Sequence, residues 1–279
     1  MDKIVRYMLE EDEGFGDVTS NALIDKDDVS VGQIFSKEDG ILAGIDIARE
    51  IFESRDITVI FNLNDGTEIS KGDLLIHVVG NTRDILLLER TVLNLLMRMS
   101  GVATAANHYV NLVKDYDVIV AGTRKTAPAI AKFDKYALAV GGADIHRFSL
   151  DDMVLIKDNH IMAVGTPLEA LKKAQNNVSF SKKIEIEVET LEDAIQCVEN
   201  KADIVMLDNM NPSEVKEVLD QLNKMGIRNN SLIEVSGGIN HETIREFAEV
   251  GVDIISSGAL THSTRSLNFG LDLKKCDSL

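Results

Sequence analysis

The chain has 279 residues and a formal net charge of −17 at pH 7, with 44% hydrophobic and 27% charged residues. This length suits one large α/β domain or two unequal domains, and the negative charge argues against a nucleic-acid partner, whose phosphates would be repelled. No apolar run is long enough to span a bilayer, and the N-terminal residues lack the apolar segment of a signal peptide. We therefore expect a protein that acts on small molecules, with no membrane partner.

The only cysteines, Cys197 and Cys276, have neither CxxC nor metal-ligand spacing. Cys197 stands in an apolar helical pattern, where a buried thiol that serves packing is expected. Together the two residues predict a reducing, cytoplasmic setting.

Residues 1–110 predict a mixed α/β layer. A short helix near the start should end at Gly14 and Gly16, and short apolar runs at 31–35, 59–61 and 74–79, separated by turn residues, predict strands with some antiparallel pairing. A long helix is expected over 83–99, broken by Gly101 and followed by a second helix over 103–113.

From residue 118 onward the pattern changes to strand, loop and helix, repeated. Strands are predicted at 118–120, 153–156, 184–189, 204–207, 232–235 and 252–256, with helices at 128–140, 167–175, 191–199, 212–225 and 241–250. The three prolines, Pro128, Pro167 and Pro212, each fall near a predicted helix start, where a missing N–H costs nothing. Repeated units without a glycine-rich dinucleotide fingerprint favour an incomplete (β/α) barrel of about six or seven strands over a Rossmann sheet.

Positive charge is concentrated in one part of this acidic chain. Residues 121–160 hold six Lys or Arg and five Asp, a net of +1, whereas the other 239 residues carry a net of −18. Within this stretch Arg124, Lys125, His146, Arg147 and Lys157 follow predicted strands or stand in the loops between them. A cationic pocket in an anionic protein suits a small, strongly anionic substrate. His146 taken alone fits a loop histidine equally well.

Polar residues also follow the later strands. Ser236-Gly237-Gly238 and Ser256-Ser257-Gly258 are glycine-bearing turns before helices, where backbone N–H groups and a hydroxyl can receive a phosphate. No Ser-His-Asp arrangement or zinc-ligand spacing of histidines is present.

Glu185, Glu187 and Glu189 alternate with apolar residues and should share one face of a strand. Burying carboxylates in a parallel strand is costly unless cations meet them. One of them, together with Asp208 from the next strand, can hold Mg²⁺ through oxygen ligands. Pairing with Lys or Arg inside the barrel is the competing interpretation, and the two are compatible.

Glu89-Arg90 interrupts an apolar helix. It is either an exposed patch of a surface helix or an arginine that reaches an anion site in another subunit.

The sequence resembles quinolinate phosphoribosyltransferase, the carboxylating nicotinate-nucleotide pyrophosphorylase family. The resemblance runs in order from Gly16-Asp17-Val18-Thr19 to His262, over nearly the whole chain. Seven co-linear motifs make it far more specific than any one of them. They are Glu89-Arg90-Thr91-Val92-Leu93-Asn94 with Ser100-Gly101-Val102-Ala103-Thr104, Thr123-Arg124-Lys125-Thr126, Gly141-Gly142 to His146-Arg147, Leu155-Ile156-Lys157-Asp158-Asn159-His160, Leu207-Asp208-Asn209, Ser236-Gly237-Gly238-Ile239 and Gly258-Ala259-Leu260-Thr261-His262.

The resemblance implies an N-terminal α/β sandwich, here 1–110, and an incomplete (β/α) barrel, here 111–263, with 264–279 packing back on the sandwich. It also implies a homodimer, or a multiple of dimers such as a hexamer, in which the sandwich of one subunit faces the barrel of the other. Arg90 would cross that interface to join the quinolinate-binding residues Arg124, His146, Arg147 and Lys157. Mg²⁺ and phosphoribosyl pyrophosphate would be held by Lys125, Glu187, Asp208, Ser236, Gly237, Gly238, Gly258 and His262, with Glu187 and Asp208 as the metal-side carboxylates and these two with Lys125 as catalytic residues.

The sequence departs from the family at two places. Ala121-Gly122 precedes Thr123 where an acidic residue is frequent, and Ala143 stands where a third glycine is common. We expect both changes to affect the fine details of substrate recognition and not the class of reaction. The sequence leaves three points open: Glu187 against Glu189 as the metal-side carboxylate, a paralogous phosphoribosyltransferase acting on another aromatic acid, and an anion-binding protein that has lost turnover.

Overall fold

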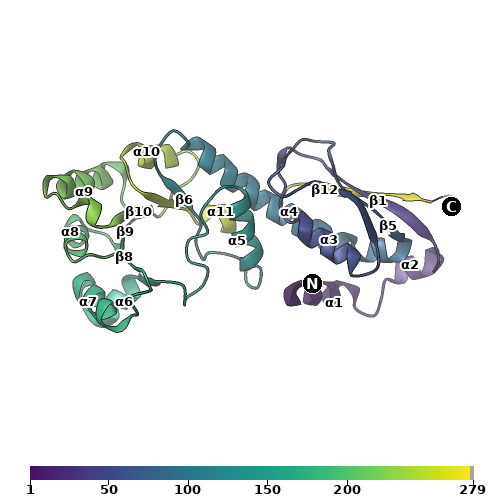
Figure 1. The fold of residues 1–279 in the computed structure, drawn as a ribbon, viewed down its shortest axis with the longest axis horizontal. Coiled ribbons are helices and arrows are strands. Elements are labelled where there is room, and N and C mark those ends of the chain that lie inside the picture. Colours follow the sequence, from purple (N-terminus) through teal and green to yellow (C-terminus); the bar gives the residue numbers. More distant parts are fainter. Residues whose placement is uncertain (277–279) are drawn as a thin grey trace. The chain divides into compact units, whose positions relative to one another are not determined.

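A computed structural model describes residues 1–276, which form two compact units (Figure 1). One unit comprises Met1–Asn107, Ala127–Gly142 and the C-terminal segment that begins at Thr264; the other comprises His108–Thr126 and Ala143–Ser263. The final three residues of the predicted 264–279 segment lie outside the described residues. No helix among residues 1–276 is both long enough and apolar enough to cross a bilayer.

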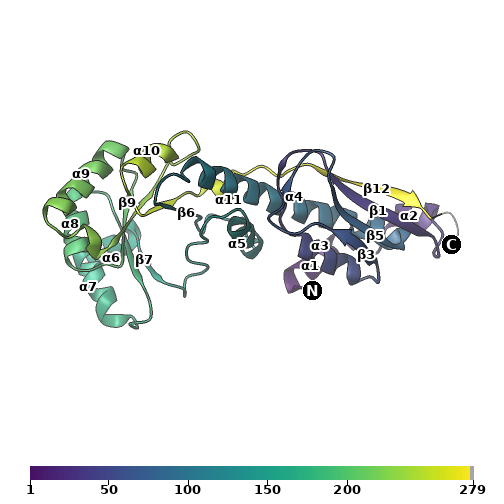
Figure 2. The ribbon, with the colours of Figure 1, turned by 45° about the horizontal axis from the view of Figure 1, so that its top comes forward.

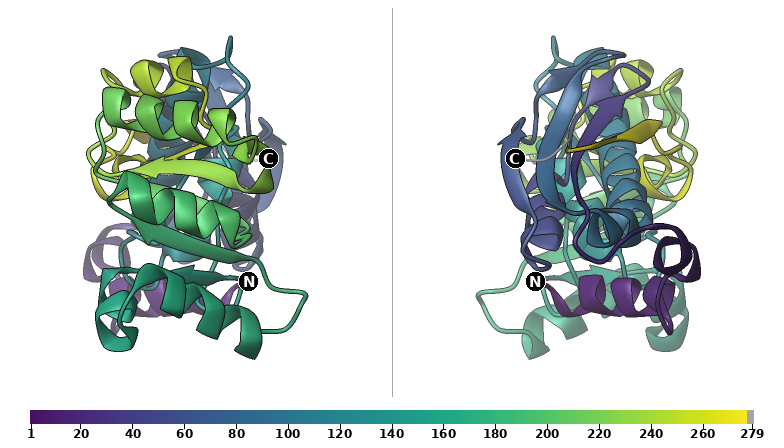
Figure 3. Two further views of the ribbon diagram at one scale, coloured as in Figure 1. Left: turned by 90° about the vertical axis from the view of Figure 1, so that its left-hand side faces the viewer. Right: turned by 90° about the vertical axis from the view of Figure 1, so that its right-hand side faces the viewer.

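The first unit contains an antiparallel sheet whose strand order is β12-β1-β5-β3. The strands are β12 (Phe269–Lys275), β1 (Val29–Ser36), β5 (Leu74–Asn81) and β3 (Thr58–Asn62). Side chains of β1 alternate between buried and more exposed, as expected for a sheet with one covered face. Strand β12 pairs with β1, with Leu271 opposite Ile34, so the last described strand completes the N-terminal sheet (Figure 3, right).

Helices and two short strands complete this unit. They are α1 (Lys3–Glu13), α2 (Val18–Leu23), β2 (Gly40–Ile41), α3 (Ile45–Glu53), β4 (Glu68–Ile69) and α5 (Ala131–Val140). The predicted end of the first helix is confirmed, because Gly14 caps α1 with a φ of 51° that L-residues rarely adopt.

The predicted break at Gly101 is wrong. A single helix, α4 (Thr82–Leu112), runs through this position. A Cβ at Gly101 would lie 2.2 Å from the carbonyl oxygen of Arg265, so the glycine permits a close backbone approach instead of ending the helix.

The second unit holds a parallel sheet of six strands within the described residues, in the order β6-β11-β10-β9-β8-β7. The strands are β6 (Ile119–Ala121), β7 (Val154–Ile156), β8 (Ile184–Val188), β9 (Ile204–Asp208), β10 (Leu232–Ser236) and β11 (Ile254–Ser256). Strands β7 to β11 pair in chain order and β6 pairs with β11, which is the order of a barrel left open between β6 and β7. The predicted incomplete barrel is confirmed, with six strands.

Helices lie between these strands, and α7, α8 and α9 form a row along the sheet (Figures 2 and 3, left). The helices are α6 (Asp158–Val164), α7 (Pro167–Asn177), α8 (Leu191–Glu199), α9 (Pro212–Lys224), α10 (Ile244–Glu249) and α11 (Ala259–His262), with a 3-10 turn η1 (Arg228–Asn230). Pro167 and Pro212 stand in the first turns of their helices, as predicted. Pro128 instead precedes α5 by a turn, because Ala129 has a φ of 66° that is incompatible with a helix.

In the second unit two short helices were not predicted, namely α6 and α11, and in the first unit α2 and α3 were not predicted. The residues of α6 and α11 looked like loops because they combine polar groups with the ends of strands. The buried thiol of Cys197, in α8, is confirmed as a packing group.

Candidate active site

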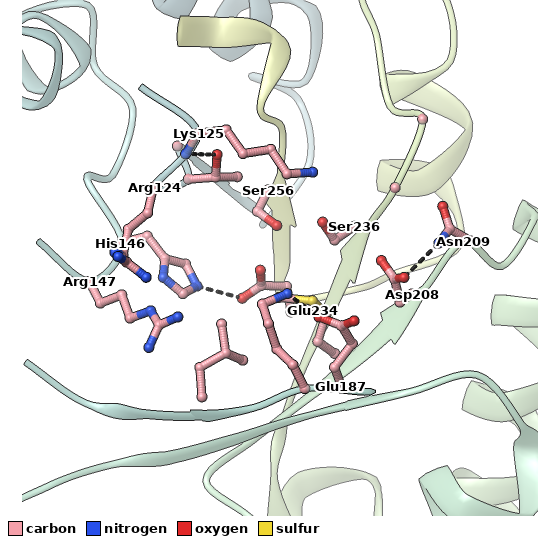
Figure 4. A pocket seen from close by; sticks show the side chains of 17 residues that line it. Arg124, Lys125, His146, Arg147, Glu187, Asp208, Asn209, Glu234, Ser236 and Ser256 are labelled. Atoms are coloured by element: carbon pink, nitrogen blue, oxygen red, sulfur yellow. Dashed lines mark hydrogen bonds and ion pairs between the residues drawn. The ribbon is translucent and has the colours of Figure 1, made fainter. Parts of the chain in front are cut away.

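The carboxyl ends of the barrel strands surround a cavity of about 500 Å³ (Figure 4). Parallel strands direct their carboxyl ends to the same edge, so the residues that follow them converge there. The cavity is lined by Gly122, Thr123, Arg124, Lys125, His146, Arg147, Leu155, Lys157, Glu187, Met206, Asp208, Asn209, Glu234, Ser236, Gly237, Gly238 and Ser256. Ten of the predicted site residues are among them: Arg124, Lys125, His146, Arg147, Lys157, Glu187, Asp208, Ser236, Gly237 and Gly238.

Three predicted residues do not line this cavity. Gly258 and His262 lie next to it, because a Cβ at Gly258 would approach both Lys125 and His262 to 2.9 Å. Arg90 belongs to the first unit, where it lines a separate cavity of about 390 Å³ together with Met8, Asn94 and other residues.

Cationic side chains gather on one side of the barrel cavity. Figure 4 shows Arg124, His146 and Arg147 together, away from Asp208 and Asn209. Arg147 is only 9% exposed, and its pKa is lowered by burial and by the neighbouring charge of Arg124. Two guanidinium groups held close in a partly buried site are unfavourable until an anion joins them, so this side is prepared for a negatively charged ligand.

Carboxylates gather on the other side. Glu187 forms an ion pair with Lys157, and burial together with the charge of Glu187 raises the pKa of Asp208. Lys157 therefore stands between the cationic and the acidic groups. The ion pair with Lys or Arg that was the competing prediction for these carboxylates is present at Glu187.

The acidic side has the donor set of a divalent-cation site. Carboxylate oxygens are the ligands that Mg²⁺ prefers, and a cation would relieve the repulsion between Glu187 and Asp208. Glu189 follows the end of β8, is exposed, and lines a neighbouring cavity with Asp208 instead of this one. The geometry therefore favours Glu187 over Glu189 for this role.

The Ser236-Gly237-Gly238 turn is fixed by Asn209. The backbone N–H of Asn209 donates to the carbonyl of Ser236 at 2.9 Å, and its side-chain amide donates to Asp208 Oδ2 at 2.6 Å. Gly237 has a φ of 96°, and a Cβ there would lie 2.2 Å from Asn209 Oδ1. Glycine is required at this position, which leaves the bare backbone of the turn facing the cavity.

Two hydrogen bonds to the backbone of Lys125 fix its position. The hydroxyl of Thr261 donates to the carbonyl of Lys125 at 2.7 Å, and the Lys125 N–H donates to Thr123 Oγ1 at 3.1 Å. The first contact links the loop after β6 to α11, and so places Lys125 beside Gly258.

Sequence reasoning missed Glu234. This carboxylate is fully buried in β10, and its Oε2 lies 3.1 Å from Nε2 of His146. Glu185 of β8, also fully buried, approaches the same nitrogen at 3.3 Å. The sequence does contain a signal: Glu234 is an acidic residue in the otherwise apolar run 232–235 and stands two residues before the turn that begins at Ser236. Glu185 likewise stands in an apolar strand two residues before Glu187, another residue that lines the cavity.

The Glu185 carboxyl has an unusual ionisation. Burial, followed by the charge of Glu234, raises its pKa from 4.5 to about 8, against the opposing charges of His146, Arg147 and Lys157. The folded chain thus binds a proton at Glu185 over a pH range in which the unfolded chain has released it. The contribution of Glu185 to the free energy of unfolding therefore falls as pH rises from about 4.5 towards 8, and it stays constant above that range.

Glu185→Gln should remove this pH dependence. We expect the difference in unfolding free energy between Glu185→Gln and the wild type to shift in favour of the variant by about 4 kcal/mol between pH 5 and pH 8.5. Urea denaturation of both proteins at the two pH values measures this change. Glu189→Gln, an exposed carboxylate two residues along, is the control and should show almost no change. An equal effect of Glu185→Gln at both pH values would contradict the assignment.

Two family models together match nearly the whole chain. The quinolinate phosphoribosyl transferase N-terminal domain matches residues 17–100, and the C-terminal domain of the same name matches residues 102–272. The chain belongs to the quinolinate phosphoribosyl transferase family. The family resemblance expected from the motifs is thereby confirmed.

Relatives of this family match the chain from end to end. A protein of Methanocaldococcus jannaschii named "Probable nicotinate-nucleotide pyrophosphorylase (carboxylating)" is 47% identical over 97% of this chain and 96% of its own length. The Mycobacterium leprae nicotinate-nucleotide pyrophosphorylase (carboxylating) is 36% identical over 96% of this chain and 95% of its own. The crystal structure of the Ehrlichia chaffeensis nicotinate-nucleotide pyrophosphorylase superposes with a TM-score of 0.92 at 32% identity, covering 98% of both chains.

Proposed function

We propose that this chain transfers the phosphoribosyl group of phosphoribosyl pyrophosphate to quinolinate with decarboxylation, yielding nicotinate mononucleotide, pyrophosphate and CO₂ for NAD biosynthesis. The observation that carries the proposal is that a single cavity holds a cationic group of side chains and a carboxylate pair side by side. The first suits a dicarboxylic acid and the second suits a metal-bound pyrophosphate. Family membership and the names of the relatives support the same reaction.

Quinolinate would bind on the cationic side. Its two adjacent carboxylates match the forked guanidinium groups of Arg124 and Arg147, while Lys157 supplies a point charge and His146 a ring N–H. Arg90 would join them from a second subunit. The enzyme would accordingly be a homodimer or a multiple of dimers, and on sequence grounds we place it in the cytoplasm.

The phosphoribosyl donor would bind on the opposite side. Lys125, Gly258 and His262 lie together there, and the Ser236-Gly237-Gly238 turn offers backbone N–H groups to phosphate oxygens. Glu187 and Asp208 would hold Mg²⁺, which when bound neutralises the charge of the pyrophosphate leaving group.

The protein's share of the chemistry is positioning and electrostatics, with no covalent nucleophile. As pyrophosphate departs, the sugar becomes oxocarbenium-like and the quinolinate nitrogen attacks its opposite face. The nitrogen then carries a positive charge, which stabilises the carbanion left when the 2-carboxylate is lost. Decarboxylation would therefore follow ribosylation.

The choice of acceptor tests this proposal. Nicotinate has one carboxylate, so it would leave part of the Arg, Lys and His set unpaired, and we expect its kcat/KM to be about 10³-fold below that of quinolinate. Steady-state assays with both acids and the same donor measure the ratio. Equal or better use of nicotinate, or of another aromatic acid, would instead indicate a paralogous phosphoribosyltransferase.

A further inference from the structure

Glu234 lies at the floor of the cavity and has no role in the proposed reaction. Its side chain is fully buried, and Oε2 faces Nε2 of His146 at 3.1 Å (Figure 4). Oε1 has no hydrogen-bond partner among residues 1–276. A parallel barrel strand would ordinarily carry an apolar residue here, because an unpaired buried carboxylate is costly. The contact with His146 is a favourable interaction of the Glu234 carboxylate that offsets part of this cost.

His146 needs such a contact. It stands in the loop between α5 and β7, outside any helix or strand, and has a left-handed φ of 54° that is unfavourable for a residue with a Cβ. Its backbone N–H is fixed by Asp144 Oδ1 at 2.6 Å. That bond fixes the main chain but not the plane of the ring.

We propose that Glu234 is a positioning residue that fixes the imidazole ring of His146 for recognition of a quinolinate carboxylate. An ionised carboxylate only accepts hydrogen bonds, so the contact requires a hydrogen on Nε2 and fixes the orientation of the ring in the cavity. The N–H offered to a quinolinate carboxylate is then that of Nδ1, so the ring acts as an imidazolium, in which both nitrogens carry a hydrogen. The proposal rests on the proposed function, because it assigns the ring to the acceptor site.

Glu185 is the less suitable partner. Its Oε2 lies 3.3 Å from the same nitrogen, but within the described part of the chain neither of its carboxylate oxygens makes a hydrogen bond. Glu185 also responds to the charges of Arg147 and Lys157 as well as His146. It balances charge around the ring, whereas Glu234 makes the directed contact.

A metal centre is the competing explanation, because ligand atoms of His146, Glu185 and Glu234 lie within 4.8 Å of one another. The cationic groups beside Glu185 oppose a further cation at this point. Metal analysis of the purified wild type decides between the two, and a transition metal retained at one equivalent per chain would overturn the positioning role.

The test compares Glu234→Leu with Glu234→Gln. Leucine fills a similar volume without an acceptor, so we expect the KM for quinolinate to rise about tenfold to 100-fold while the KM for phosphoribosyl pyrophosphate stays within about twofold. Glutamine keeps an amide oxygen that can accept from Nε2 and should restore most of the quinolinate affinity. A residue needed only for folding would instead alter both KM values and would not be rescued by glutamine.

A double-mutant cycle with His146→Ala completes the test. If Glu234 acts through the ring, Glu234→Leu should add less than about twofold to the effect of His146→Ala. Full additivity, or an unchanged quinolinate KM in Glu234→Leu, would overturn the role of Glu234 while the wild type remains active. A wild type that forms no nicotinate mononucleotide would overturn the proposed function, and this inference with it.

Discussion

Replacing Asp208 with alanine should lower kcat/KM about 10³-fold, because the proposed donor site would lose one of the two carboxylates proposed to hold Mg²⁺. Burial and Glu187 already raise the pKa of Asp208, which indicates a position where negative charge is concentrated for a cation. Steady-state assays over a range of Mg²⁺ concentrations measure the effect. Asp208→Asn, which keeps one oxygen ligand, should need more Mg²⁺ for half-maximal activity.

Asp220 provides a matched control for Asp208. It is an exposed carboxylate on α9 paired with Lys216, and Asp220→Ala should leave turnover and melting temperature nearly unchanged.

Lys125→Ala should impair the same half of the site and lower kcat/KM by about 10²-fold to 10³-fold. Near-normal turnover in both Asp208→Ala and Lys125→Ala would contradict the donor site.

Replacing Arg90 with alanine should reduce kcat/KM for quinolinate about 100-fold, although Arg90 does not line the barrel cavity of its own chain. The reason is the proposed contribution of Arg90 to the cavity of a second subunit. An Arg90→Ala chain mixed with an Arg124→Ala chain would then form heterodimers with one intact site and one doubly altered site. We expect isolated heterodimers to regain about half of the wild-type activity.

Differently tagged chains allow those heterodimers to be purified and counted. Dimers assembled from two differently tagged Arg90→Ala chains are the control and should keep the low activity of the Arg90→Ala variant. No recovery in verified Arg90→Ala and Arg124→Ala heterodimers would remove the cross-subunit role of Arg90.

Strand periodicity was sufficient to predict the barrel, and polar residues at strand ends, the cationic stretch 121–160 and the family resemblance together predicted ten residues of its cavity. Apolar runs and helix-starting residues such as Pro167 and Pro212 are local signals, and parallel strands bring their ends together whatever the details. Gly101 was misread because its reason is not local. The backbone of Arg265, more than 160 residues away in sequence, approaches it.

Glu234 was missed for a related reason. A single acidic residue in an apolar strand gives no indication of its partner, and His146 lies on a loop 88 residues earlier. Its significance depends on two distances, from Glu234 and from Glu185 to one ring nitrogen, which only the folded chain brings together. The side-chain ion pair between Lys157 and Glu187 likewise joins groups that the sequence had assigned to separate substrates.

The most direct test of the central claim is to incubate the wild-type chain with Mg²⁺ and quinolinate labelled in its 2-carboxylate, with and without phosphoribosyl pyrophosphate. We predict that labelled CO₂ and nicotinate mononucleotide form in equal amounts, and only when the phosphoribosyl donor is present. CO₂ release without the donor, or no nicotinate mononucleotide with it, would contradict the account.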